Sequence, residues 1–296
     1  MSGVIGFIGL GIMGGPMASN LLDAGFEVIG FDVVPASLER LAAAGGKVAV
    51  SAGQAAAEAD VVITMLPNHP QVEAVSLGEG GVLDSAKPGT LYIDMSSIRP
   101  ETARRLAEVG AERGIRVLDA PVSGGEKGAV DGVLSIMVGG SEADFAAAGP
   151  VFAPLGKTIV HVGPNGAGQT VKAANQLVVG GTYALVAEAV VLLEASGLDA
   201  GIGLDVLAGG LAGSRILELK RRSIVAREFQ PGFRIDLHHK DMGIILDAAR
   251  DAGVALPVGN LVAALIAAAR AQGYGQLDHS ALLKVAENLS GKGEAA

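Results

Sequence analysis

VIGFIGLGIMGGPMASNLLDAG, residues Val4–Gly25, combines a short apolar strand, a glycine-rich turn and the start of a helix. Gly9, Gly11 and Gly14 have the spacing G-x-G-x-x-G. In this motif the glycines permit a tight turn, close approach of the backbone to a pyrophosphate, and close packing of helix on strand. The N-terminus of the helix adds N–H groups that favour phosphate. The segment predicts a dinucleotide-binding loop made of Gly9, Leu10, Gly11, Ile12, Met13 and Gly14.

A second expected strand, Glu27–Phe31, leads directly into Asp32. An acidic residue about 20 positions after the glycines binds the ribose hydroxyls in such folds. The carboxylate of Asp32 would repel a 2′-phosphate, and Arg40 comes too late in the chain to follow the strand. We therefore expect Asp32 to favour NADH over NADPH. A glycine turn in an unrelated α/β protein is the alternative for the whole segment.

Strand and helix patterns alternate through the first half of the chain, as a parallel sheet requires. The ends of two strands are candidate ligand-binding positions, because ligands bind beyond the carboxyl ends of strands in open sheets. Leu66 and Pro67 follow one strand, and Ser96 follows another, so these three are candidate walls of a nicotinamide site. For Ser96 the alternative is capping of the next helix. The expected strands are Val4–Ile8, Glu27–Phe31, Lys47–Val50, Val61–Met65, Leu91–Asp94, Ile115–Asp119, Leu134–Val138 and Thr158–Val162.

Ser123, Gly124 and Gly125 follow the strand that ends at Asp119. A hydroxyl beside glycine N–H groups suits a small carboxylate, which predicts a substrate-binding loop. A plain turn is the alternative, because serine and glycine are also common turn residues.

Gly163–Ala195 is rich in alanine, leucine and valine after its glycine-rich entry, and it contains one proline, at its second position. It predicts one long helix, apolar on most sides and therefore buried. Its polar residues Gln169, Lys172, Asn175 and Gln176 recur at spacings of three and four and share one face. A buried lysine is costly unless it is used, so we expect Lys172 to be catalytic. The alternative is a lysine that reaches water from a helix end.

Strand signals stop near Gly163, and only helical patterns follow. The predicted fold class is α/β, with a Rossmann-type domain at residues 1–163. An all-helical substrate and oligomerisation domain follows at residues 164–296, entered through a long interdomain helix. In this second domain Lys240 lies in His238-His239-Lys240-Asp241, which is expected to open a helix. Lys240 is a candidate for binding cofactor and substrate, and a solvated helix end is the alternative.

Composition excludes several classes of function. The chain of 296 residues has a net charge of −9, which argues against nucleic acid as a partner. It has no cysteine, so thiolate metal sites and thiol nucleophiles are excluded, and the histidines lack metal-ligand spacing. The longest apolar run, Leu177–Ala187, is too short to span a membrane. These features predict no metal site, no membrane association and a cytoplasmic location.

Taken together, the motifs resemble the β-hydroxyacid dehydrogenase family, relatives of 3-hydroxyisobutyrate and 6-phosphogluconate dehydrogenases. The resemblance runs nearly end to end. FIGLGIMGGPMASNLL is similar to the family's cofactor signature, DAPVSGGEKGAVDGVLSIMVGG to its substrate loop and GAGQTVKAANQ to its catalytic segment. LHHKDM and GQLDHSALL complete the set. The pair Asn175-Gln176 and the last motif look most like the branch that acts on tartronate semialdehyde.

The resemblance implies a role for each matching residue. Lys172 looks like the general acid and base, and Asn175 like the neighbour that orients substrate. Ser123, Gly124 and Gly125 look like the carboxylate-binding loop, and Lys240 like a residue that lines the site. The implied substrate is a small carboxylate-bearing semialdehyde or hydroxy acid, and the implied assembly is a homodimer or homotetramer.

Other functions remain open at this level. Within the family, 3-hydroxyisobutyrate, glyoxylate and succinic semialdehyde are alternative substrates. Imine reductases share the architecture but usually lack the lysine, so Lys172 counts against them. A non-catalytic NAD-binding regulator would need the glycine loop but not the polar helix face.

Overall fold

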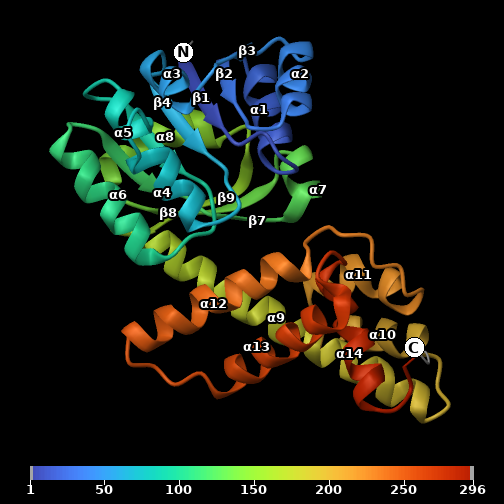
Figure 1. Ribbon diagram of the computed structural model, residues 1–296. Coiled ribbons are helices and arrows are strands. Elements are labelled where there is room, and N and C mark those ends of the chain that lie inside the picture. The colour runs from blue at the N-terminus through green and yellow to red at the C-terminus, as the bar shows by residue number, and fades with distance from the viewer. Residues whose placement is uncertain (1–2, 294–296) are drawn as a thin grey trace. The chain divides into compact units, whose positions relative to one another are not determined.

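The structure, a computed structural model, describes residues 3–293. Its contacts divide the chain into two compact units, the first ending at Lys172 and the second beginning at Ala173. The first unit holds the sheet and the second is helical (Figure 1).

A nine-stranded sheet forms the centre of the first unit, with the order β3-β2-β1-β4-β5-β6-β8-β7 and with β9 beside β8. Strands β1 to β6 run parallel to one another. Their carboxyl ends therefore meet at one edge, where ligands bind in such sheets. The strands are β1 (Val4–Ile8), β2 (Glu27–Phe31), β3 (Lys47–Val48), β4 (Val61–Thr64), β5 (Leu91–Asp94), β6 (Arg116–Asp119), β7 (Val122–Ser123), β8 (Leu134–Gly139) and β9 (Gly156–Gly163).

Helices cover both faces of this sheet (Figure 1). Successive strand residues point to opposite faces of the sheet and pack in two hydrophobic clusters. Ile93 belongs to one cluster with Phe7 and Phe152, and Tyr92 belongs to the other with Leu106. The helices are α1 (Gly14–Asp23), α2 (Pro35–Ala43), α3 (Ala52–Ala57), α4 (His69–Leu77), α5 (Val82–Ser85), α6 (Pro100–Glu112), α7 (Gly125–Val130) and α8 (Glu142–Phe152).

The far side of the sheet differs from the all-parallel prediction. Strand β8 runs antiparallel to β6, and β7, a strand that the sequence did not suggest, runs antiparallel to β8. Strand β7 is only two residues long, Val122 and Ser123, because Gly124 with a φ of 143° turns the chain into α7.

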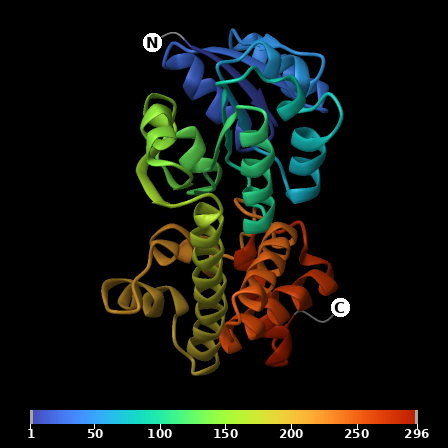
Figure 2. The same ribbon diagram turned by 90° about the vertical axis from the view of Figure 1, so that its left-hand side faces the viewer.

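Helix α9 (Ala167–Ala195) is continuous over 29 residues (Figure 2), so the long helix is confirmed. The prediction that this helix is buried does not hold for one of its faces. Val178, Leu185 and Leu192 are 67%, 68% and 68% exposed, at intervals of seven residues along one face. By length and composition alone α9 is able to cross a membrane, a test that core helices of soluble proteins also pass.

The second unit packs helices around the C-terminal part of α9. Figure 2 shows α10 and α11 on one side of α9, and α12, α13 and α14 on the other. Gly273, with a φ of 86°, breaks the helical run after α13. The elements are α10 (Ala200–Gly209), α11 (Arg215–Val225), α12 (Ile235–Asp251), α13 (Pro257–Ala269), η1 (Arg270–Tyr274), η2 (His279–Ala281) and α14 (Leu282–Leu289).

Candidate active site

Glycine occupies each of the three motif positions after β1 for a different structural reason. A Cβ on Gly9 would lie 2.3 Å from the carbonyl oxygen of Met65, and the φ of Gly9 is 92°. A Cβ on Gly14 would lie 1.9 Å from the Gly9 carbonyl oxygen, so Gly14 allows α1 to pack on the loop. A Cβ on Gly11 would meet nothing within 4 Å. Internal packing therefore does not require glycine at position 11, and open space there suits a ligand that approaches the backbone.

A hollow of about 410 Å³ lies beside this loop. Leu10, Gly11 and Ile12 form part of its wall, and Arg40 on α2 forms another part. The Arg40 guanidinium donates to the hydroxyl of Ser37 at 2.9 Å. The open face of Gly11, the start of α1 and this hollow fit the diphosphate part of a dinucleotide. Arg40 thus lies closer to the loop than its distance in sequence suggested.

The Asp32 carboxylate joins the ends of β1 and β2. Its Oδ2 accepts from the N–H of Leu10 at 2.6 Å, and its Oδ1 accepts from the N–H of Val34 at 2.8 Å. These bonds hold a carboxylate beside the glycine loop, where the spacing predicted it.

Leu66 and Ser96, predicted to lie together from the ends of separate strands, are joined directly. The Leu66 N–H donates to Ser96 Oγ at 2.9 Å, and Ser96 Oγ–H donates to Asp94 Oδ1 at 2.7 Å. The alternative that Ser96 caps the next helix is wrong, because the N-cap of α6 is Arg99. Ser96 instead fixes the loop that carries Leu66 and Pro67.

Asp94 is the buried centre of this network, and the sequence did not single it out. Its Oδ1 also accepts from Thr64 at 2.7 Å, while its Oδ2 has no hydrogen-bond partner within residues 3–293. Burial raises the pKa of Asp94 to about 6, against bonds from Thr64 and Ser96 that lower it. The one sequence signal was a strand, Leu91–Asp94, that ends in an acidic residue.

Asp119, at the end of β6, holds the start of α9. Its carboxylate accepts from the backbone N–H of Gly166 at 2.7 Å and of Gln169 at 3.0 Å. The Gln169 side chain donates to the Ser96 carbonyl at 2.8 Å and accepts from the Ile98 N–H at 3.0 Å. Gln169 therefore ties the first turn of α9 to the loop after β5 and does not serve as a free polar group.

Lys172 lies on the next turn of α9 and is only 7% exposed. The alternative of a lysine that simply reaches water is therefore wrong. A nearly buried amine follows a helical turn that is hydrogen-bonded to the carboxyl ends of two parallel strands, the edge where ligands bind.

The Ser123-Gly124-Gly125 loop joins β7 to α7. Gly124 and Gly125 have φ values of 143° and 63°, so both adopt backbone conformations that favour glycine. A Cβ on Gly124 would lie 3.0 Å from the Leu134 side chain. The loop is a turn, as the alternative stated, and that does not exclude the predicted binding of a carboxylate.

In the second unit, Gln176 and Lys240 are linked through Asp241. Gln176 Nε2 donates to Asp241 Oδ2 at 2.7 Å, and Lys240 Nζ forms an ion pair with Asp241 Oδ1 at 2.8 Å. Helix α12 begins at Ile235, earlier than predicted, and the Lys240 side chain is 16% exposed, so a solvated helix end is wrong. Asn175 Oδ1 is buried and has no hydrogen-bond partner in the described chain.

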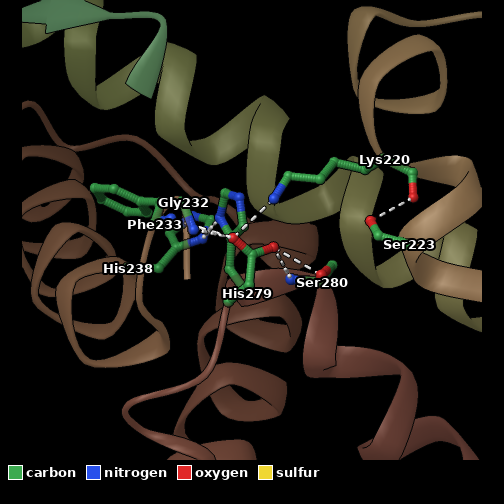
Figure 3. A network of polar contacts seen from close by, with 8 residues as sticks. Lys220, Ser223, Gly232, Phe233, His238, His279 and Ser280 are labelled. Carbon is green, nitrogen blue, oxygen red and sulfur yellow. Dashed lines mark hydrogen bonds and ion pairs between the residues drawn. The ribbon is translucent and has the colours of Figure 1, made fainter. Parts of the chain in front are cut away.

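A second polar network in this unit centres on Asp278 (Figure 3). Asp278 accepts from Lys220 at 3.0 Å, from the Gly232 N–H at 2.8 Å and from the Ser280 hydroxyl at 2.7 Å. It also accepts from the Ser280 N–H and so caps η2. Residues 3–293 contain no group of three or more His, Cys, Asp or Glu side chains suited to a metal ion.

Two family models together cover most of the chain. Residues 4–163 match the NAD binding domain of 6-phosphogluconate dehydrogenase, and residues 166–286 match the NAD-binding domain of NADP-dependent 3-hydroxyisobutyrate dehydrogenase. The chain belongs to the β-hydroxyacid dehydrogenase family. Membership makes the protein a nicotinamide-dependent dehydrogenase that acts on CH–OH groups, with a small hydroxy acid or semialdehyde as substrate.

Characterised relatives of this dehydrogenase have different substrates. The chain is 44% identical to 2-hydroxy-3-oxopropionate reductase of Escherichia coli, over 97% of this chain and 98% of the relative. It is 43% identical to 2-(hydroxymethyl)glutarate dehydrogenase of Eubacterium barkeri, over 97% and 96%. A solved 3-hydroxyisobutyrate dehydrogenase of Mycobacterium tuberculosis with L-serine matches with a TM-score of 0.88 and 40% identity, covering 96% of this chain and 99% of that one.

Proposed function

We propose that the enzyme reduces tartronate semialdehyde (2-hydroxy-3-oxopropanoate) to D-glycerate with NADH, in a reversible reaction. The observation that carries the proposal is the buried amine of Lys172, held by a helical turn that Asp119 and Ser96 anchor at the strand ends. The choice of substrate rests on the similarity to 2-hydroxy-3-oxopropionate reductase and on Gln176.

Lys172 is the proposed general acid and base. When bound, the reduced nicotinamide supplies the hydride to the aldehyde carbon. Negative charge then develops on the aldehyde oxygen, and the Lys172 ammonium stabilises that charge and donates the proton. In the oxidation direction the neutral amine of Lys172 accepts the hydroxyl proton of glycerate.

The remaining predicted site residues position the reactants. We assign the substrate carboxylate to Ser123, Gly124 and Gly125, which fixes the carbonyl for reaction. The buried, unpartnered Oδ1 of Asn175 is an acceptor suited to a substrate hydroxyl. Lys240 is assigned to the substrate and cofactor as well, and Gly9–Gly14, Asp32, Leu66, Pro67 and Ser96 to the cofactor.

Preference for NADH is part of the proposal. The Asp32 carboxylate is held beside the glycine loop by two backbone N–H groups, so it is in place to accept from ribose hydroxyls and to repel a 2′-phosphate. Arg40 on the wall of the neighbouring hollow opposes this preference, because an arginine near the ribose accommodates a 2′-phosphate.

We assign residues 1–163 to cofactor binding and residues 164–296 to substrate binding and oligomerisation, in a cytoplasmic homodimer or homotetramer. The absence of cysteine fits a reducing compartment. The exposed Val178, Leu185 and Leu192 recur every seven residues, the spacing with which helices pack on one another. A second copy of the chain is the proposed partner of this face, which light scattering after size-exclusion chromatography tests.

A substrate panel tests the proposed reaction. Protein and NADH are mixed in turn with tartronate semialdehyde, methylmalonate semialdehyde, glyoxylate and succinic semialdehyde, and loss of nicotinamide absorbance is followed. We expect the highest kcat/KM with tartronate semialdehyde. A higher value with methylmalonate semialdehyde would assign the enzyme to 3-hydroxyisobutyrate oxidation instead.

A further inference from the structure

We propose that Gln176 and Asp241 are positioning residues for substrate binding, and that both act through the ammonium of Lys240. The inference rests on the proposed function, because it requires that Lys240 contact the substrate. It assigns Gln176, so far only a member of the polar face of α9, a role that needs no direct contact with the substrate.

The contacts of the Asp241 carboxylate carry the inference. Its Oδ2 accepts from the Gln176 side chain at 2.7 Å, and its Oδ1 pairs with Lys240 Nζ at 2.8 Å. The side chain of Asp241 is only 4% exposed and that of Lys240 16% exposed. Consecutive residues of a helix do not face each other, so Lys240 must fold back to reach its neighbour. Asp241 therefore sets where the ammonium lies, and Gln176 sets where Asp241 lies.

The charge of the pair indicates what Lys240 recognises. The ion pair of Lys240 with Asp241 has no net charge. Such a pair is poorly suited to attracting a diphosphate. The ammonium is nevertheless a hydrogen-bond donor that the ion pair holds in a fixed position. Of the two roles assigned to Lys240 above, the ion pair thus favours contact with the oxygen atoms of the substrate over contact with the cofactor. We expect the Gln176–Asp241 contact to affect KM for substrate rather than affinity for NADH.

The length of the Gln176 side chain is essential to this arrangement. An asparagine at the same position is shorter by one carbon, a loss of about 1.5 Å of reach. Because the Gln176 bond to Asp241 is 2.7 Å long, the amide nitrogen of an asparagine would lie beyond hydrogen-bonding distance of the carboxylate. Glutamine or asparagine at position 176 would thus change substrate recognition without either side chain touching the substrate.

A neighbouring contact supplies a matched control. His238 on α12 bonds the backbone carbonyl of Gln176 through Nε2 at 3.1 Å, and its Nδ1 lies 3.1 Å from His279 Nδ1 (Figure 3). A carbonyl only accepts, so His238 Nε2 carries a hydrogen. His238 thus joins the same two helices as the Gln176–Asp241 bond, but through the backbone of Gln176 instead of the Asp241 carboxylate. Loss of His238 should weaken helix packing without releasing Lys240.

The test compares Q176N, D241N, K240M, H238N and the double variant Q176N/K240M, with the panel substrate that gives the highest kcat/KM. We expect Q176N and D241N to raise KM about tenfold, the effect of one lost positioned hydrogen bond, with less than about threefold change in kcat. NADH affinity, measured by fluorescence titration, should not change. The double variant should have the KM of K240M alone, because Gln176 acts through Lys240. H238N should lower the Tm with little change in KM.

Two results would separate failure of this inference from failure of the proposed function. If K240M leaves KM unchanged, Lys240 does not bind substrate, and the role proposed for it is wrong. If K240M raises KM but Q176N does not, or if the effects of Q176N and K240M multiply, Gln176 does not act through Lys240. A KM increase in H238N equal to that in Q176N would reduce Gln176 to a packing residue and overturn the inference.

Discussion

The backbone N–H of Gln169 donates a 3.0 Å hydrogen bond to the buried carboxylate of Asp119. The second carboxylate oxygen of Asp119 accepts from the N–H of Gly166. One side chain at the end of β6 therefore satisfies two N–H groups at the start of α9, groups that have no partner inside a helix. Lys172 follows on the next turn, so Asp119 fixes the helix that carries the proposed proton donor.

We expect Asp119→Asn to lower kcat about tenfold and to lower the Tm, because the amide nitrogen of asparagine faces an N–H group that needs an acceptor. NADH affinity should change less than kcat, since the Asp119 carboxylate bonds to the start of α9 and not to the glycine loop. Steady-state kinetics well below the Tm, together with fluorescence titration of NADH, measure these effects. Full turnover in this variant would mean that Lys172 does not depend on the Asp119 contact.

The acidity of Asp94 predicts a pH-dependent stability. Burial raises the pKa of Asp94 from 3.8 to about 6, so the folded state holds its proton more tightly than the unfolded state. The ionised form therefore destabilises the fold above pH 6, by about 3 kcal/mol from the size of the shift. Asp94→Asn mimics the neutral acid and should be more stable than the wild type above pH 6, with the advantage vanishing near pH 4.

Calorimetry of both proteins between pH 4 and pH 8 checks this prediction. The asparagine oxygen still accepts from Thr64 and Ser96, so the loop that carries Leu66 keeps its support. A constant difference in Tm across this range would show that Asp94 does not titrate where we expect.

Asp278 should show the opposite pH dependence. Burial acts to raise the pKa of Asp278, but the charge of His279 and the bonds from Ser280 and Lys220 outweigh it and lower the pKa to about 2. Its ionised form therefore stabilises the fold above pH 4, and that contribution is lost as the pH falls toward 2. Asp278→Asn should be less stable than the wild type at pH 7, with the difference shrinking in acid. A difference that grows in acid would contradict the assignment.

Local patterns were enough to predict the first part of the site. The strand, the three glycines, the helix and Asp32 lie within one short segment, and each has a sequence signal of its own. The all-parallel sheet was wrong beyond β6, because the pairing of β7 with β8 depends on a two-residue strand with little pattern. The fold class needed only the alternation of strands and helices, and it is confirmed.

The supports of the site depend on contacts between distant residues, which no local pattern reveals. On the polar face of α9, Gln169 bonds to Ser96 and Gln176 bonds to Asp241, partners that are 73 and 65 residues away in the chain. The sequence treated these side chains as equivalent to Lys172. Only these bonds show that Gln169 and Gln176 hold the helix in place.

Cofactor choice is tested by Asp32→Ser. Removal of the carboxylate charge should raise the ratio of kcat/KM for NADPH to that for NADH by at least about tenfold. Serine keeps one acceptor for the N–H groups of Leu10 and Val34, so the loop should retain its shape. Arg40→Ala is the matched control, and we expect it to leave the ratio nearly unchanged. A wild-type enzyme that already prefers NADPH would show that Arg40, not Asp32, decides.

Lys172→Ala tests the proposed chemistry itself. Loss of the general acid should lower kcat by about two to four decades, the usual contribution of such a group, while NADH affinity changes little. Lys172→Arg is the informative partner, because a guanidinium keeps the positive charge but does not release its proton in the working pH range. We expect the arginine variant to bind substrate better than the alanine variant and yet to remain as slow in turnover. Near-normal kcat in either variant would rule out Lys172 as the proton donor.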